Sequence, residues 1–224
     1  MSSSSLTLDE VIARLAASGP PGRRTSPRSG EEGGRPAEAN GLRPRGDHDL
    51  NPDFYDPSKS LTPAAVLVPI VDRDAGPTVL LTRRTDHLYH HAGQISFPGG
   101  QVDPVDSNAE AAALRETEEE IGLPRRHITL VGTLDTYVTR TGFEVLPKVG
   151  VVAPPFPLAP DSFEVAEVFE VPLDFFLVPE NRKTHSRVYQ GKERHFYVFP
   201  YRDYFIWGAT AGMLVNLVEV LGDR

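Results

Sequence analysis

The sequence predicts an α/β fold in which a mixed β-sheet lies between layers of helices. Two observations favour this class: segments rich in Val, Leu and Thr alternate with segments of helical pattern, and 224 residues suffice for one domain with a substantial core. No internal repeat is apparent. We therefore expect an α/β/α sandwich.

The N-terminal region is predicted to be a short helix followed by a linker. Thr7 and Glu10 form a capping box that opens a helix within residues 1–17. Residues 18–47 are crowded with Gly, Pro, Ser and Arg and offer almost no apolar side chains to bury, so we expect a disordered linker. A basic docking arm for anionic partners is the alternative, although glutamates dilute its charge. We expect the folded domain over residues 48–224.

Strand and helix signals follow one another through this domain. The predicted strands are 64–71, 78–83, 129–138, 144–152 and 164–171, and a late hairpin pairs 186–190 with 195–199. Residues 208–221, with the sequence GATAGMLVNLVEVL, are predicted as a closing helix. The order of these segments predicts a sheet covered by helices.

The strongest local signal is a helix in the middle of the chain. Ser107 and Glu110 fit a capping box, and residues 108–121 contain neither Gly nor Pro. Gly122 stands where a left-handed C-terminal stop is expected. The sequence therefore predicts a helix that ends at Ile121.

Three carboxylates share one face of this helix. At about 100° per residue, Glu119 and Glu120 lie on either side of Glu116, whereas Glu118 points the opposite way. Like charges at these spacings destabilise a helix by about 0.2–0.5 kcal/mol per pair, which a bound cation would offset. Oxygen ligands suit Mg²⁺ or Mn²⁺ rather than zinc. A solvated acidic surface is the alternative for such a turn taken alone.

Paired glycines precede this helix in the run Phe97-Pro98-Gly99-Gly100. Glycines allow the close backbone approach that a metal or phosphate requires. A plain turn is the alternative for Pro-Gly-Gly in isolation. Next to the carboxylate helix, we favour a contribution to the same site.

These motifs resemble the signature of the Nudix hydrolases, which runs Gly, five residues, Glu, seven residues, then Arg-Glu-apolar-x-Glu-Glu-x-Gly-apolar. Residues 115–123 match its second half, with Thr117 in the apolar position. Counted back from Arg115, the first Glu of the signature falls on Ser107 and its Gly on Gln101. The loop after Gly100 is thus one residue longer than in the signature.

The resemblance implies a Nudix-type α/β/α sandwich and a role for each matched residue. Glu116, Glu119 and Glu120 would bind divalent cations, Mg²⁺ or Mn²⁺. Arg115 would hold a glutamate in place, and the region of Gly100 would contribute a backbone carbonyl. The implied activity is a metal-dependent pyrophosphohydrolase.

A second resemblance concerns the substrate. Residues 80–100 are similar to the segment that marks the coenzyme A pyrophosphatase branch of the Nudix hydrolases. The matching positions are Leu80, Leu81, Thr82, Arg84, Gly93 and Phe97 to Gly100. The pattern differs at Thr85, where it has Ser or Ala, and at Tyr89, where it has a second Arg.

The resemblance implies cleavage of coenzyme A or a derivative to 4′-phosphopantetheine and adenosine 3′,5′-bisphosphate. A Nudix hydrolase of ADP-ribose or another nucleoside diphosphate or triphosphate is the alternative that Tyr89 keeps open. A catalytically silent, nucleotide-binding Nudix-like module is the third hypothesis. The intact Arg-Glu-x-x-Glu-Glu run argues against a silent module.

Further residues are candidates for substrate contacts and proton transfer. The expected substrate contacts are Arg84, Thr82, Gly99, Gly100 and His91. Either Glu120 or Glu164 is expected to take the proton of the attacking water, and an exposed strand-edge glutamate is the alternative for Glu164. Trp207, Tyr201 and Tyr204 either stack on a base or, as we expect beside an apolar helix, pack in the core.

Composition limits the partners. The net charge is −8 without a sustained basic stripe, so we expect a small diphosphate substrate and no duplex nucleic acid. Cysteine is absent, and no apolar run approaches the ~18 residues that span a membrane. The sequence MSSSSLTLDEV lacks secretory-signal features, which makes a cytoplasmic location the expectation. The oligomeric state stays open.

Overall fold

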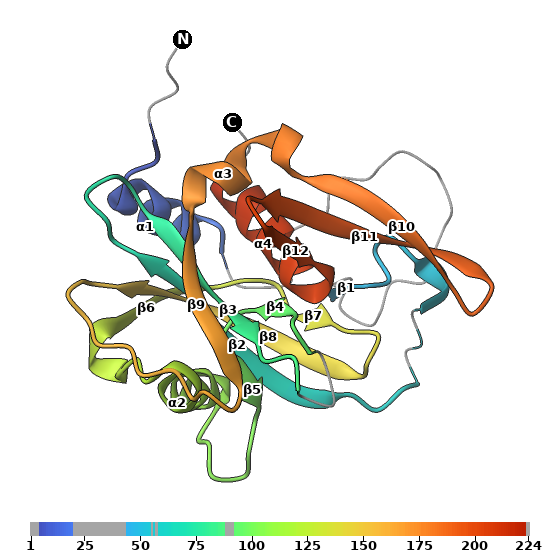
Figure 1. The fold of residues 1–224 in the computed structure, drawn as a ribbon, viewed down its shortest axis with the longest axis horizontal. Helices are drawn as coiled ribbons and strands as arrows, with labels where there is room; N and C mark the ends of the chain where they lie inside the picture. The colour runs from blue at the N-terminus through green and yellow to red at the C-terminus, as the bar shows by residue number, and fades with distance from the viewer. Residues whose placement is uncertain (1–4, 20–43, 55, 57, 88–91, 223–224) are drawn as a thin grey trace.

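The computed structural model describes residues 5–19, 44–54, 56, 58–87 and 92–222 (Figure 1). In this part of the chain, a nine-stranded mixed sheet is built around β2 (Thr62–Val71). Strand β2 pairs in parallel with β8 (Phe143–Val152) over its whole length. It pairs antiparallel with β3 (Thr78–Arg84) at one end and with β5 (Gly99–Gln101) at the other.

The remaining strands extend this sheet or form a second one. Strand β3 also pairs with β4 (Ile95–Ser96) and β9 (Val165–Pro172). Strand β8 also pairs with β6 (Ile128–Thr133) and β7 (Tyr137–Val138), and β7 pairs with β1 (Arg45–Gly46). A separate antiparallel sheet contains β10 (Lys183–Tyr189), β11 (Lys192–Tyr201) and β12 (Tyr204–Trp207). The predicted mixed sheet is confirmed.

Helices cover both faces of the main sheet (Figure 1). Helix α2 (Ala109–Ile121) lies on one face, and α1 (Leu8–Ala17), α3 (Leu173–Leu177) and α4 (Gly208–Leu221) lie on the other. Short 3-10 turns occur at Pro52–Phe54, Arg125–His127 and Pro179–Asn181. The predicted α/β/α sandwich is therefore confirmed. No helix in the described residues is long and apolar enough to cross a membrane.

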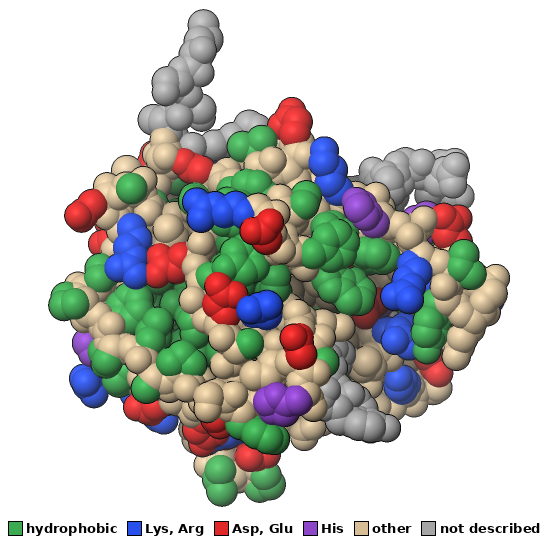
Figure 2. All heavy atoms as spheres, in the orientation of Figure 1, with side chains coloured by type: hydrophobic (Ala, Val, Ile, Leu, Met, Phe, Trp, Pro, Cys, Tyr) green, Lys and Arg blue, Asp and Glu red, His purple; other side chains and the backbone are tan. Residues whose placement is uncertain are grey.

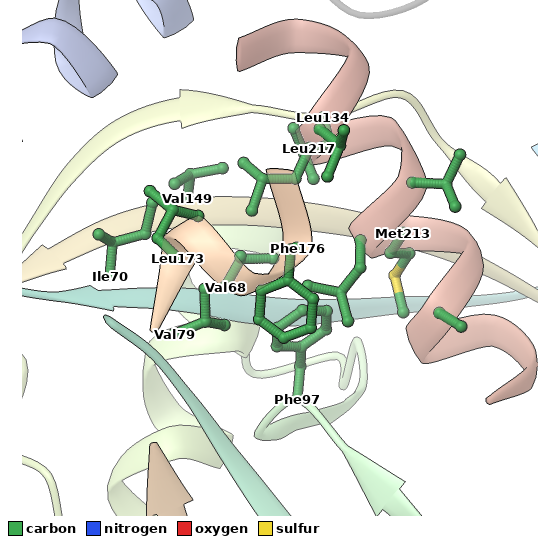
Figure 3. Packing of buried hydrophobic residues seen from close by; sticks show 14 of the residues in the cluster. Val68, Ile70, Val79, Phe97, Leu134, Val149, Leu173, Phe176, Met213 and Leu217 are labelled. Atoms are coloured by element: carbon green, nitrogen blue, oxygen red, sulfur yellow. The ribbon is translucent and has the colours of Figure 1, made fainter. Parts of the chain in front are cut away.

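The main core lies between the sheet and the α3 and α4 layer. Figure 3 shows side chains from the helices meeting side chains from the strands: Leu173, Phe176, Met213 and Leu217 against Val68, Ile70, Val79 and Val149. Each fully buried side chain of this size contributes about 1.5–3 kcal/mol to stability. The apolar closing helix predicted from the sequence is thus a principal element of the core.

The opposite face of β2 explains the position of α2. Ala65 of β2 and Ala112 and Ala113 of α2 form a buried cluster. These small side chains allow the helix to lie close against the strand. This contact sets the distance between the sheet and the carboxylates of α2.

The predicted start of α2 is wrong by one residue. Asn108 rather than Ser107 is the N-cap, and its side chain accepts a hydrogen bond from the backbone N–H of Ala111 at 2.9 Å. Glu110 does not close a capping box, because with Asn108 as the N-cap the N3 position is Ala111; Glu110 pairs instead with Lys148 of β8 at 2.8 Å. The predicted end is confirmed, since Gly122 adopts a left-handed φ of 65°.

Two other boundaries also differ from expectation. The predicted strand 129–138 is interrupted after Thr133, because the backbone N–H of Asp135 donates to the Asn216 side chain of α4. The late hairpin is longer than predicted and pairs residues 183–189 with 192–198. Helix α1 begins with the predicted Thr7–Glu10 capping box.

The interval predicted as a disordered linker is too long at its C-terminal end. Arg45 lies in β1, is buried, and forms ion pairs with Asp135, at 3.0 Å, and with Glu219 of α4. These two carboxylates lie far along the chain, which is why local composition did not reveal the strand. Residues 20–43 lie outside the described residues.

Candidate active site

The glycine pair brings β5 against the carboxylate face of α2. A Cβ atom on Gly100 would lie 2.6–2.7 Å from the carboxyl atoms of Glu116, and one on Gly99 would lie 2.4 Å from the carbonyl oxygen of Ala65. Neither position has room for a side chain. Gly99 also has a φ of 147°, which disfavours other residues. The structure thus supports close backbone approach rather than a plain turn.

Glu120 is the most buried of the three carboxylates. Its residue is 7% exposed, and its Oε2 accepts a hydrogen bond of 3.2 Å from the backbone N–H of Gly99. Burial raises the pKa of Glu120 to about 7, and the carboxylates of Glu116 and Glu164 add to this effect. A carboxyl group held in this way gains from a neighbouring positive charge, which favours its ionised form.

Arg115 organises the other carboxylates of the helix. Its Nη1 donates to Glu116 and to Glu119, each at 2.9 Å. Its Nε and Nη2 make a two-pronged pair with Asp106 at 3.0 and 2.9 Å. Two-pronged Arg–carboxylate pairs fix the orientation of the guanidinium group. Arg115 therefore contacts glutamates, as the resemblance implied, from a position set by Asp106.

Asp106 is a site residue that the sequence prediction missed. Counted forward from Gly100, the first Glu of the Nudix signature falls on Asp106, whereas counting back from Arg115 gives Ser107. The extra residue of the loop thus lies between Asp106 and Arg115. A forward count, together with the carboxylate chemistry that Asp shares with Glu, would have identified it.

The three glutamates differ in exposure although they share a helix face. The Glu119 side chain is 61% exposed and Glu116 is half-buried, while Glu120 is almost covered. Glu118 points away and pairs with Arg125 at 3.2 Å, as expected for a surface charge. Among the described residues, no three acidic or histidine side chains converge into a ready-made metal cage.

Even so, the donor set fits a hard divalent cation. Mg²⁺ typically uses one or two protein carboxylates and keeps several waters, so a closed cage is not required. Glu116 and Glu120 offer partly shielded carboxylates, and the carboxyl group of Glu116 lies directly against the backbone of Gly100.

Arg84 connects the helix to a second acidic segment. Its Nη1 lies 3.8 Å from Glu120 and its Nη2 lies 4.0 Å from Glu164. Both distances exceed those of an N–H···O hydrogen bond. The buried Nε of Arg84 has no hydrogen-bond partner in the described part of the chain. A buried donor without a partner costs about 1–3 kcal/mol, so an acceptor brought to the Nε of Arg84 would be stabilising.

Backbone hydrogen bonds hold Glu164 at this position. The N–H of Asp161 donates to the carbonyl of Glu120, and the N–H of Thr85 donates to the carbonyl of Glu164. The segment is thereby tied both to the end of α2 and to the end of β3. Glu164 thus lies beside Arg84, and its side chain is 43% exposed.

Two expected substrate contacts are not placed in the site. Thr82 is 1% exposed, and its hydroxyl donates to the carbonyl of Ser96 at 3.2 Å. We therefore assign Thr82 a structural role in the β3–β4 pair instead of the expected contact. His91 lies outside the described residues.

Known proteins match this chain over most of its folded domain. The family model of the NUDIX domain matches residues 61–191, more than half of the chain. An uncharacterized Nudix hydrolase, NudL, of Escherichia coli (strain K12 / DH10B) is 41% identical over 161 residues, which are 72% of this chain and 83% of that protein. NudL of Cronobacter sakazakii is 39% identical over 175 residues, 78% of this chain and 91% of that protein.

Solved structures align over about half of the chain. A Nudix hydrolase from M. smegmatis, RenU, has a TM-score of 0.44 and 27% identity, and the match covers 51% of this chain and 73% of that one. A C. elegans Ap4A hydrolase in a binary complex has a TM-score of 0.44 and 22% identity, and the match covers 50% of this chain and 80% of that one.

The family assignment comes from the domain model and from the NudL relatives. Nudix hydrolases split nucleoside diphosphate-linked compounds and generally need divalent metal ions. The chain contains the carboxylate helix and the glycine pair within the residues that the family model matches. The chain therefore belongs to the Nudix family and is a pyrophosphohydrolase of a nucleoside diphosphate-linked substrate.

Proposed function

We propose that the substrate is coenzyme A or a derivative, cleaved to 4′-phosphopantetheine, or its acyl form, and adenosine 3′,5′-bisphosphate. The observation that carries the proposal is Arg84, whose buried Nε has no hydrogen-bond partner among the described residues and whose guanidinium lies between Glu120 and Glu164. Arg84 belongs to the segment 80–100 that resembles the coenzyme A branch. Its three nitrogens are suited to donate to diphosphate oxygens.

Mg²⁺ or Mn²⁺ is the proposed cofactor. Glu116 and Glu120 would hold it, with Glu119 contributing once its carboxylate leaves Arg115 and Gly100 offering a backbone carbonyl. Bound there, the cation would neutralise phosphate charge and lower the pKa of a coordinated water. Because Gly100 has no side chain, the Glu116 carboxylate lies against the backbone there, and both could contact one cation.

We assign the proton-accepting role to Glu164 rather than to Glu120. The Glu164 side chain is 43% exposed and so remains accessible to water, while Arg84 faces it at 4.0 Å. Glu120 is covered and accepts the N–H of Gly99, which suits a ligand held in one orientation. A base must reach the water whose proton it takes, and Glu164 meets that requirement better.

A substrate panel tests this function. The full chain is assayed with Mg²⁺ and with Mn²⁺ on coenzyme A, acetyl-coenzyme A, oxidised coenzyme A, ADP-ribose and a nucleoside triphosphate, and the products are separated by anion-exchange chromatography. We expect the highest kcat/KM on a coenzyme A compound and no turnover in excess EDTA. A higher kcat/KM on ADP-ribose or the triphosphate would assign the alternative substrate class instead.

A further inference from the structure

Outside the carboxylate site, a hollow lies on the face of β3 that is turned away from α2. It has a volume of about 730 Å³. Its principal lining side chains are Arg83, Glu167, Arg202, Tyr204, Phe205 and Trp207. Strands β12 and β4 lie side by side here (Figure 1). Figure 2 shows hydrophobic side chains gathered on this side of the molecule, over β11 and β12, with charged side chains beside them.

The aromatic side chains of the hollow are held by neighbours that leave ring surface available. Tyr204 stacks one face on Phe169, with ring centres 3.8 Å apart and planes within 3°. Trp207 meets Phe196 edge-on at 5.3 Å. Phe205 is 46% exposed. Fixed aromatic surface that remains open to solvent suits a flat aromatic ligand.

Charged groups stand next to this aromatic wall. Arg83 pairs with Glu167 at 3.2 Å, and the hydroxyl of Tyr204 donates to Glu167 at 2.6 Å. Arg202 is exposed at the turn between β11 and β12, where its guanidinium lies over the Tyr201 ring at 5.1 Å. An aromatic wall with a guanidinium at its rim matches a base that carries a phosphate.

The hollow and the carboxylate site share the end of one strand. Arg83 faces the hollow and its neighbour Arg84 faces Glu120, because successive side chains of a strand alternate between faces. Their Cα atoms are about 3.8 Å apart. Gln94, which also lines the hollow, accepts the backbone N–H of Arg84 at 2.9 Å. One ligand that passes the end of β3 would therefore reach both places.

We propose that this hollow binds the nucleoside end of the substrate, with the base against Phe205 and Trp207 and the phosphate on its ribose at Arg202. The inference rests on the proposed function and deepens it, since it separates the place that recognises the nucleoside from the place that splits the diphosphate. The chemical class of the ligand is a purine nucleoside that carries phosphate on its ribose. The hollow thereby selects the leaving group while Arg84 and α2 act on the diphosphate.

Trp207 makes a direct test available, because it is the one tryptophan of the 224-residue chain. The full chain in EDTA is titrated with adenosine 3′,5′-bisphosphate while tryptophan fluorescence is recorded. We expect a saturable change that 4′-phosphopantetheine and inorganic pyrophosphate do not produce. Adenosine 3′,5′-bisphosphate should also inhibit turnover competitively.

Three variants sharpen the titration. Phe205→Ala should weaken nucleotide binding about tenfold, which corresponds to ~1.4 kcal/mol and falls within the range for loss of one base–aromatic stack. Arg202→Ala should abolish the preference for adenosine 3′,5′-bisphosphate over adenosine 5′-monophosphate. Tyr189→Ala is the matched control, because it removes an exposed aromatic ring on the neighbouring hairpin outside the hollow.

The outcomes separate the two proposals. Turnover of coenzyme A without any fluorescence change would overturn the hollow as a nucleoside site and leave the proposed function standing. A saturable change with no turnover of any diphosphate would support the hollow and overturn the proposed function. Non-competitive behaviour of adenosine 3′,5′-bisphosphate, or equal binding by wild type and Phe205→Ala, would also overturn the hollow as a substrate subsite.

Discussion

An arginine lies next to a glutamate near each end of β3, but only the pair near the start is joined by hydrogen bonds. At its start, Glu170 accepts hydrogen bonds from Arg73 at 2.5 and 3.1 Å and from Thr78 at 2.5 Å. At its end, Arg84 lies 3.8 Å from Glu120 and leaves its Nε without a hydrogen-bond partner in the described residues.

The pKa values follow this contrast. Although burial acts to raise it, the bonds from Arg73 and Thr78 hold the pKa of Glu170 below its ordinary value. Burial raises the pKa of Glu120 to about 7, and the distant Arg84 does not compensate. A fold gains stability from the first arrangement and loses some at the second, which is typical of functional sites. The contrast distinguishes the end of β3, where we propose that a ligand completes the bonding.

Replacing Glu120 should give the largest effect on activity. Glu120→Gln keeps the shape and removes the carboxylate that would hold the cation, so kcat should fall by at least about 10²-fold while the protein stays folded. Steady-state kinetics on the preferred diphosphate and a thermal melt measure both quantities. Glu118→Gln is the control, since Glu118 lies on the same helix but pairs with Arg125 at the surface. An unchanged kcat in Glu120→Gln would remove this residue from the chemistry.

Arg84→Ala should lower kcat/KM by about 10- to 100-fold, the equivalent of one or two charge-assisted hydrogen bonds to the diphosphate. The melting temperature should hold or rise, because a buried donor without a partner is removed. Arg125→Ala provides a matched surface control. If Arg84→Ala binds and turns over the substrate like the wild type, the contrast between the ends of β3 has no functional meaning.

Asp106→Asn should raise the metal concentration for half-maximal activity by about tenfold, since outer partners of metal ligands typically contribute 10- to 100-fold to affinity. Asn offers only one carbonyl oxygen to the guanidinium group, so Arg115 is no longer fixed by a two-pronged pair. Asp106→Glu should restore part of the affinity. The metal affinity is measured by titrating activity and protein fluorescence with the cation. The same affinity in the wild type, Asp106→Asn and Asp106→Glu would contradict the role of Asp106.

The smallest effect is expected at the start of β3. A carboxyl group with a lowered pKa stabilises the fold above its unfolded value of 4.5, and this contribution is lost as the pH falls through the lower folded value. Because Arg73 is partly exposed, the contribution should be about 1 kcal/mol or less. Urea unfolding of wild type and Glu170→Gln should therefore differ at pH 7 and converge toward pH 3. Catalysis at pH 7 should not change, and a kcat loss would refute the contrast.

The parts of the site that depend on local sequence were predictable. Helix α2, its stop at Gly122 and the shared face of its glutamates follow from spacing alone, and the glycine pair indicated close approach. The environment of Arg84 was not predictable, because it depends on how β3 meets α2 and the segment before β9. Arg45 looked like linker for the same reason, since both of its partners lie at least 90 residues away. Asp106 could have been predicted, because counting the signature forward from Gly100 reaches it, whereas counting back from Arg115 reaches Ser107.

The anchoring of α1 has a consequence for the connection that follows it. Val11 and Leu15 are buried in the main core, and Arg14 donates to the carbonyl of Leu221, so the helix is fastened independently of the chain beyond it. On the C-terminal side of the connection, Arg45 is held by its ion pairs with Asp135 and Glu219. The described chain is therefore fastened to the folded domain both before residue 20 and after residue 43. Two fragments produced by a break anywhere between Gly19 and Pro44 should stay together under native conditions and separate only on denaturation.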